Sequence, residues 1–159
     1  MTDVLTLALR VIDQLGQHGV EYVVVGGVAV NIHGLARGTE DLDLLIRPDP
    51  ANVDRLRSAL RAVWDDPHID EISADDLCGE YPSVRYGPPS GPFYLDILTR
   101  LGSLASFDDV EAEEVVLEGV AVRVATPRAL FRLKRGTLRP IDHADAAALA
   151  RAFGIKSEE

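Results

Sequence analysis

Apolar residues in the first fifty positions change from a helical to a strand-like spacing. Over residues 4–18 they recur on one broad face of a helix. The β-branched run at 21–25 then predicts a strand, and the short apolar segment at 27–33 predicts a second helix. Polar and apolar residues alternate at 41–46, which predicts a second strand. The predicted order is therefore helix, strand, helix, strand.

The middle of the chain has a weaker pattern. Residues 51–64 place apolar positions at helical spacing and predict a third helix. The acidic stretch 65–79 holds no period for long, and it fits either an irregular loop or a short acidic helix. The segment 81–86 is compatible with a strand, and the apolar run at 93–98, after a turn rich in glycine and proline, predicts another.

The last third of the chain begins with a hairpin and ends in helices. Segments 114–117 and 120–125 are predicted strands joined by a two-residue turn. A proline after a threonine starts a helix over 126–134, and a further helix is predicted over 141–153.

Length and composition fit one α/β domain. The chain has 159 residues, of which 47% are hydrophobic, so it can bury a sizeable core. We expect a single domain over 1–159, with its core at 20–100 and C-terminal helices at 126–153. The expected architecture is a mixed central β-sheet of about five strands with flanking helices, packed chiefly on one face of the sheet. Strands 41–46 and 93–98 are expected to be neighbours.

Charge and cysteine content exclude several classes of protein. The formal net charge of -10 argues against a general nucleic-acid-binding surface, although it leaves room for a local basic patch. A lone cysteine excludes an internal disulfide and a cysteine zinc cluster. Asp3, Arg10 and Asp13 interrupt the apolar N-terminal pattern, which is therefore neither a signal peptide nor a membrane span. We expect a cytoplasmic protein.

Three aspartates stand in otherwise apolar strands. Asp41 and Asp43 are two residues apart, so their side chains share one face of a strand, with their α-carbons roughly 6 to 7 Å apart. If the strand that holds Asp96 pairs beside them, all three carboxylates converge at one edge of the sheet. Such a cluster is expected to bind two Mg²⁺ ions about 4 Å apart, as in polymerase-type phosphoryl transfer. Asp96, nearest the acceptor, would also be the general base.

Other residues are candidates for contacts with phosphates. Gly26 and Gly27 form a strand-to-helix turn, where backbone amides can approach a phosphate closely. Arg37 and Thr39 precede the aspartates and offer a charged group and a hydroxyl, and Lys134 on a late helix offers a second charge. Taken singly, each has an ordinary explanation: a tight turn, a surface arginine, or a solvated helix lysine.

The order of these parts resembles the nucleotidyltransferases of the DNA polymerase β superfamily, closest to its minimal and AbiEii-like toxin branches. The resemblance rests on a glycine pair, then Arg-x-Thr-x-Asp-x-Asp, then a later Leu-Asp-Ile strand. It covers 20–46 closely, 93–98 through the third aspartate, and 125–149 more loosely. In the superfamily many members have serine as the second residue of the turn, whereas this chain has Gly27, so backbone amides must make that contact.

The resemblance implies a single-domain nucleotidyltransferase fold and a metal-dependent enzyme that moves a nucleoside monophosphate from an NTP to an acceptor. Asp41, Asp43 and Asp96 would match the metal-binding carboxylates, and Lys134 a lysine that meets the nucleotide phosphates. The implied cofactor is Mg²⁺, and the implied acceptors are RNA (tRNA) or protein. The implied setting is a toxin-antitoxin or phage-defence system with a cognate antitoxin or toxin partner. Antibiotic-modifying relatives act on small hydroxylated molecules, which makes a small-molecule acceptor an alternative.

The same residues also allow a protein without catalysis. Asp41 could cap a turn and Asp96 could pair with Arg85 or Arg100, which would leave a nucleotide- or partner-binding module, such as an antitoxin that acts by contact. The acidic pair Asp142 and Asp145 fits a structural role, capping or pairing with Arg139 and His143. A local basic patch that would keep RNA as an acceptor is formed by Arg128, Arg132, Lys134, Arg135 and Arg139.

Overall fold

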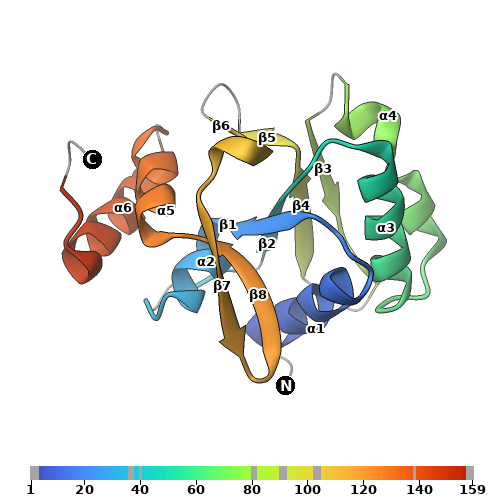
Figure 1. The fold of residues 1–159 in the computed structure, drawn as a ribbon, viewed down its shortest axis with the longest axis horizontal. Helices are drawn as coiled ribbons and strands as arrows, with labels where there is room; N and C mark the ends of the chain where they lie inside the picture. The colour runs from blue at the N-terminus through green and yellow to red at the C-terminus, as the bar shows by residue number, and fades with distance from the viewer. Residues whose placement is uncertain are drawn as a thin grey trace.

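The structure is a computed structural model that describes residues 4–35, 38–39, 41–79, 82–89, 93–101, 105–137 and 139–156. Its helices are α1 (Val4–Gln17), α2 (Gly26–Ile32), α3 (Pro50–Arg61), α4 (Ala74–Leu77), α5 (Pro127–Arg135) and α6 (Pro140–Phe153), with short 3₁₀ helices η1 (Pro67–Glu71) and η2 (Phe107–Asp109). Its strands are β1 (Tyr22–Val25), β2 (Asp41–Ile46), β3 (Ser83–Tyr86), β4 (Tyr94–Leu98), β5 (Arg100–Leu101), β6 (Ala105–Ser106), β7 (Ala112–Leu117) and β8 (Val120–Ala125). Figure 1 shows their arrangement.

The predicted elements are present, with small differences at their ends. Helix α3 ends at Arg61, three residues before the predicted end of that helix. The ambiguous stretch 65–79 contains both η1 and α4, each begun by a capping side chain, Asp66 and Ser73 respectively. Within the described ranges, no helix is long and apolar enough to cross a bilayer.

The central sheet is mixed and has six strands in the order β3-β4-β2-β1-β8-β7. We expected about five strands, and the sheet has six. Its edge strand β3, antiparallel to β4, falls in the segment 81–86 that was compatible with a strand. Strands β2 and β4 run parallel as neighbours, as predicted, and β1 lies antiparallel to β2 on its other side. The β7–β8 hairpin forms the opposite end of the sheet, and a separate two-stranded sheet joins β5 to β6.

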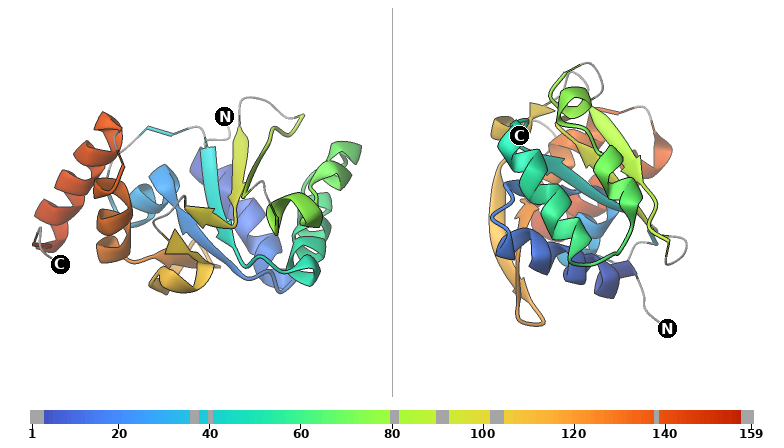
Figure 2. Two further views of the ribbon diagram at one scale, coloured as in Figure 1. Left: turned by 90° about the horizontal axis from the view of Figure 1, so that it is seen from above. Right: turned by 90° about the vertical axis from the view of Figure 1, so that its right-hand side faces the viewer.

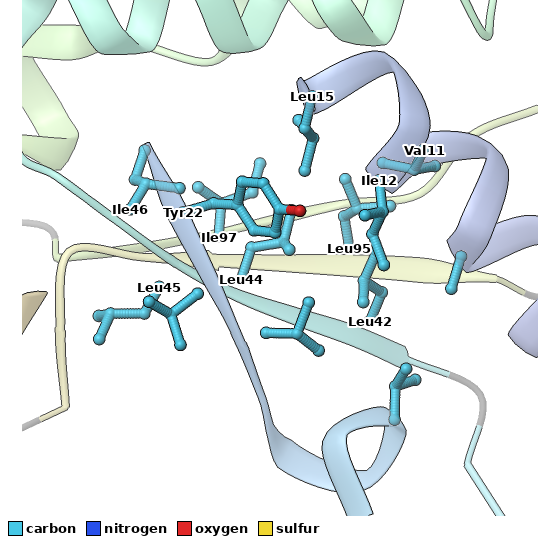
Figure 3. Close-up of a cluster of buried hydrophobic side chains, with 14 of the residues drawn as sticks. Val11, Ile12, Leu15, Tyr22, Leu42, Leu44, Leu45, Ile46, Leu95 and Ile97 are labelled. Carbon is cyan, nitrogen blue, oxygen red and sulfur yellow. The ribbon is translucent and has the colours of Figure 1, made fainter. Parts of the chain in front are cut away.

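The hydrophobic core lies against one face of this sheet. Side chains alternate along a strand, so Leu42, Leu44 and Ile46 of β2 share a face, and each is 0% exposed. Helices α1 and α3 contact each other, and α1 also contacts β2 and β8. Figure 3 shows part of the layer between α1 and the sheet, with Val11, Ile12, Leu15, Tyr22, Leu44 and Leu95. Burying each such side chain contributes roughly 1.5–3 kcal/mol.

The C-terminal helices stand apart from α3 and α4. Figures 1 and 2 both show α5 and α6 side by side at one end of the molecule, with α3 and α4 at the other end. Helix α5 contacts α2. The expectation that the helices pack chiefly on one face holds for α1 and α3, whereas α5 borders the opposite face, where the polar positions of β2 and β4 lie.

A buried asparagine fixes the junction of β1, β2 and α3. Asn52, in the first turn of α3, is 0% exposed. Its Oδ1 accepts a hydrogen bond from the backbone N–H of Glu21 at 2.8 Å, and its Nδ2 donates to the carbonyls of Glu21 at 3.0 Å and Arg47 at 3.1 Å. These bonds join the backbone just before β1 to the backbone just after β2. The two carbonyls also accept backbone N–H groups, Glu21 from Arg47 at 3.2 Å and Arg47 from Asp49 at 2.9 Å, so the N–H of Glu21 depends most on Asn52.

We therefore predict that Asn52→Ala lowers the free energy of unfolding by about 1–3 kcal/mol, because the backbone N–H of Glu21 loses its hydrogen-bond partner. Urea denaturation of the two proteins measures the difference. The matched control is Asp54→Ala on the same helix, which breaks only an exposed ion pair with Arg57 and should cost less than about 0.5 kcal/mol. Equal effects of the two changes would contradict the bracing role of Asn52.

Candidate active site

The three aspartates are brought together on the face of the sheet opposite the core. Asp43 is directly opposite Asp96 in the parallel register of β2 and β4, and Asp41 precedes Asp43 by two residues on the same face. The convergence therefore occurs on two inner strands of the sheet and not at its edge, because β3 and β1 flank the pair. The side chains of Asp41 and Asp96 are 33% and 26% exposed, so solvent and ligands can reach them.

Gly26 gives the carboxylate of Asp43 the space that it occupies. Val25 pairs with Asp43 across β1 and β2, and Gly26 follows with a φ of +73°. A Cβ at position 26 would lie 2.0 Å from Asp43 Oδ2 and 2.8 Å from its Cγ. Glycine is therefore required twice here, for the left-handed backbone and for the close approach of the carboxylate. Gly27 follows as a buried residue in the first turn of α2.

The crowding of negative charge changes the acidity of the central aspartate. Burial raises the pKa of Asp43 to about 7, helped by the charge of Asp96, a hydrogen bond with Asp96, and the charge of Asp41; the positive charge of Lys134 acts in the opposite direction. Near neutral pH the Asp43 carboxyl is therefore only partly ionised in the protein without a bound cation.

A guanidinium sits among the same carboxylates. Arg85 on β3 is opposite Asp96 in the register of β3 and β4. Its Nε donates to Asp96 Oδ1 at 2.9 Å, and its Nη2 donates to Asp96 Oδ2 at 3.2 Å and to Asp41 Oδ2 at 3.1 Å. The guanidinium lies over the ring of Tyr94, 4.7 Å from its centroid. Arg85 was expected only as an alternative partner of Asp96, and that contact is present. The alternation of side chains in Ser-Val-Arg-Tyr was the signal that Arg85 could share a face with Asp96 of the neighbouring strand.

A cleft of about 720 Å³ opens beside Asp43 and Asp96. Its apolar lining comes from both the sheet side and α5, with Val25, Pro82, Leu98, Leu101, Leu130 and Leu133. Gly26 and Lys134 also line it, so the glycine turn, two of the aspartates and the lysine border one cavity. The volume falls within the range of small-molecule sites and suits a nucleotide.

Lys134 is held in the cleft by two buried acids. It is 6% exposed, and its Nζ lies 3.0 Å from Asp145 Oδ2 and 3.5 Å from Asp142 Oδ1. Thr137 donates its hydroxyl to Asp142 Oδ2 at 2.9 Å. The acidic pair is structural, as expected, but its main partner is Lys134: Arg139 is 3.8 Å from Asp142. His143, the other expected partner, contacts the carbonyl of Thr137.

The remaining candidates have other surroundings. Thr39 bonds the backbone of Asp41, with Oγ1 donating to the carbonyl at 3.2 Å and accepting from the N–H at 3.3 Å, so its hydroxyl fixes the start of β2. Arg37 lies outside the described residues.

The predicted basic patch on the tail does not include Lys134. Lys134 points inward to its acids. Arg128 and Arg132 line a separate small pocket together with Asp109 and Glu111. Arg128, Arg132 and Arg135 are exposed and are spaced four and three residues apart, so they share one face of α5, whereas Lys134 lies on another.

The donor set fits a hard divalent cation. Carboxylate oxygens are the preferred ligands of Mg²⁺, and the site already attracts a cation, the Arg85 guanidinium, as well as a proton on Asp43. In the part of the chain that the structure describes, however, no three acidic, histidine or cysteine side chains are arranged as a formed metal site. Asp41, Asp43 and Asp96 would hold the ions once Arg85 releases the oxygens of Asp41 and Asp96.

Comparison with known families identifies one match. The family model described as "Nucleotidyl transferase AbiEii toxin, Type IV TA system" matches residues 9–148, which include all three aspartates and Lys134. No match is found among curated proteins.

Solved structures share the fold. An antigenic nucleotidyltransferase-like protein from Paracoccidioides brasiliensis superposes with a TM-score of 0.60 at 19% identity, over 95% of this chain and 77% of that one. ANT(2")-Ia in complex with adenylyl-2"-tobramycin gives a TM-score of 0.57 at 14% identity, over 94% of this chain and 89% of that one. The solution structure of the antibiotic-resistance factor ANT(2'')-Ia gives the same score and identity, over 94% and 84%. At such identities the likeness concerns the fold alone.

The contact between Gly26 and Asp43 makes a testable prediction. Gly26→Ala should lower transfer activity at least about 100-fold, since its Cβ must displace the Asp43 carboxylate. It should also cost about 1–2 kcal/mol of stability from the left-handed backbone. Gly119→Ala is the control, because Gly119 has a φ of +80° and open space around it. The control should lose similar stability by thermal denaturation but keep its activity; loss of activity in both would refute a specific contact.

The raised pKa of Asp43 predicts how stability depends on pH in EDTA. The unfolded carboxyl titrates near 3.8 and the folded one near 7, so the folded state binds the proton more tightly. Its contribution to stability is present below pH 3.8 and is lost as the pH rises through 7. The loss is at most about 4 kcal/mol. Relative to wild type, Asp43→Asn should become more stable with rising pH, as urea denaturation at pH 5 and pH 8 would measure; a constant difference would contradict the prediction.

Proposed function

Because the chain belongs to the AbiEii nucleotidyl transferase toxin family, we propose that it transfers a nucleoside monophosphate from an NTP to an RNA (tRNA) or protein acceptor, with Mg²⁺ bound at Asp41, Asp43 and Asp96. The observation that carries this proposal is the register of β2 and β4, which sets Asp43 opposite Asp96 beside a nucleotide-sized cleft. The family also implies a toxin-antitoxin setting, with a cognate partner protein.

The reaction moves one phosphoryl group. An acceptor hydroxyl oxygen forms a bond to the α-phosphorus of the NTP, the bond from that phosphorus to the bridging oxygen breaks, and pyrophosphate leaves. Asp96, the outermost carboxylate of the facing pair, takes the hydroxyl proton. Bound Mg²⁺ supplies Lewis-acid polarisation and neutralises phosphate charge.

The other residues orient the nucleotide. Gly26 and Gly27 let the backbone approach the phosphates. Lys134, fixed by Asp142 and Asp145, contributes a positive charge from the α5 side of the cleft at a defined position. Arg37 is proposed to add a second charge. Thr39 acts through the backbone of Asp41, which it holds in place.

A second candidate function follows from Arg85. Its contacts with Asp41 and Asp96 satisfy these carboxylates within the protein. With these carboxylates already paired, the protein would need no metal ion to fold. It could then bind a nucleotide or a partner without catalysis, as an antitoxin that acts by contact does. The small-molecule acceptor of the structural neighbour ANT(2'')-Ia, named in its complex with adenylyl-2"-tobramycin, defines a further acceptor class to include in the assay.

The test is transfer of label from each α-labelled NTP with Mg²⁺ to total tRNA, to cell protein, or to an aminoglycoside. Wild type should label one acceptor class, and EDTA should abolish the labelling. Asp41→Ala should reduce it at least about 1,000-fold, because a metal ligand is lost, whereas Asp54→Ala, at an exposed position on α3, should leave it unchanged. If no nucleotide yields label and Asp41→Ala does not alter nucleotide or partner binding, the binding module is the better description.

A further inference from the structure

Arg85 uses the carboxylate oxygens that a divalent cation needs. It bonds Asp96 Oδ1, Asp96 Oδ2 and Asp41 Oδ2, which are three of the six oxygens on Asp41, Asp43 and Asp96. A further oxygen, Asp43 Oδ2, faces Gly26. A bidentate guanidinium–carboxylate pair is among the strongest and most directional hydrogen-bonded pairs in proteins. Arg85 and a cation therefore compete for the same ligands.

The arginine is positioned for this contact and is also free to leave it. Its strand register places it opposite Asp96, and the Tyr94 ring supports the guanidinium from the side. Tyr94 in turn lies against Gly87, where a Cβ would come within 3.1 Å of the ring. The Arg85 side chain is nevertheless 55% exposed, so a change of rotamer swings it into solvent without displacing the core.

Arginine differs from other cations in how it can be released. Its guanidinium stays protonated throughout the accessible pH range, so it cannot leave by losing charge. It must be displaced from the carboxylates by another cation. A bound triphosphate would present phosphate oxygens to the guanidinium after the exchange, since arginine pairs with phosphate as well as with carboxylate.

We propose that Arg85 is an internal cation that holds Asp41 and Asp96 until a divalent ion replaces it, and that this exchange makes metal binding weak alone and stronger with nucleotide. The inference rests on the proposed metal-dependent function. It makes Arg85 a positioning residue: it keeps the like-charged aspartates together in the free protein and links occupation of the metal site to arrival of the NTP.

Direct metal binding tests the proposal without a turnover assay. Mn²⁺ is titrated into the 159-residue chain in the presence and absence of a non-hydrolysable α,β-methylene ATP, with free Mn²⁺ measured by electron paramagnetic resonance. Arg85→Met keeps an apolar stem over Tyr94 and removes the charge. Arg85→Lys keeps the charge but loses the bidentate contact with Asp96. Arg100→Met is the matched control, because Arg100 lines the same cleft and, within the described part of the chain, makes no ion pair with the three aspartates.

Arg85→Met should bind Mn²⁺ at least about tenfold more tightly than wild type without nucleotide, because an opposite charge beside a carboxylate shifts its affinity for a cation by about that factor. Arg85→Lys should lie between the two. The nucleotide should tighten Mn²⁺ binding more in wild type than in Arg85→Met. Arg85→Met should also melt at a lower temperature in EDTA and gain more from Mn²⁺ than wild type does.

Two results would overturn the proposal while leaving the function intact: unchanged Mn²⁺ affinity in Arg85→Met, or an equal increase in Arg100→Met, in either case with binding still lost in Asp43→Asn. Absence of Mn²⁺ binding from wild type and all variants, with and without nucleotide, would instead remove the metal-dependent function and the exchange together. Should Arg85→Met fail to fold even with Mn²⁺, Arg85→Lys gives the same comparison with the charge retained.

Discussion

The site is organised by repulsion between carboxylates that the sheet forces together. Asp43 and Asp96 are paired across two parallel strands, and Asp41 stands on the same face. Parallel pairing sets neighbouring residues about 5 Å apart, so the negative charges cannot separate without breaking the sheet. A proton on Asp43, the Arg85 guanidinium and the nearby Lys134 all reduce this repulsion. The surroundings of the three aspartates follow from that one constraint.

The opposite face of the same strands supplies the stability that the charged face requires. Leu42, Leu44 and Ile46 alternate with the aspartates along β2 and are fully buried under the helix layer. Because side chains alternate strictly, a one-residue slip of β2 would bury the acids and expose the leucines. The hydrophobic layer thus fixes the register, and the register fixes the positions of the carboxylates. Folding and the geometry of the site depend on the same six residues of β2.

Two cations in the site are bound in different ways. Lys134 is buried and fixed by Asp142 and Asp145 from the neighbouring helix, so its charge has a set position beside the cleft. Arg85 is half exposed and forms ion pairs with two carboxylates of the proposed metal site. A fixed charge suits a phosphate contact that is present throughout a reaction. An exchangeable one suits a ligand that arrives with its own cation.

The sequence by itself determined the elements and the identity of the acids. The periodicity of apolar residues predicted the strands and long helices, because burial of one face imposes that periodicity whatever the partner element is. The pattern Asp-Leu-Asp-Leu placed Asp41 and Asp43 on one face of their strand. The pattern Leu-Asp-Ile placed Asp96 on the face of its own strand opposite the apolar neighbours. The glycine pair after β1 was also recognised, since its turn is a local requirement of the backbone.

The tertiary structure decided which of these residues meet. The alternative contacts of Asp96 were open until strand order placed Arg85 beside it, because pairing between strands far apart in the chain has no local signature. The approach of Gly26 to Asp43 joins two strands and is set by their register. Of the tail residues that looked like one basic patch, Lys134 is directed inward to Asp142 and Asp145. Local pattern reports which face of an element is buried, whereas charge contacts depend on the three-dimensional path of the chain, and only the fold specifies that path.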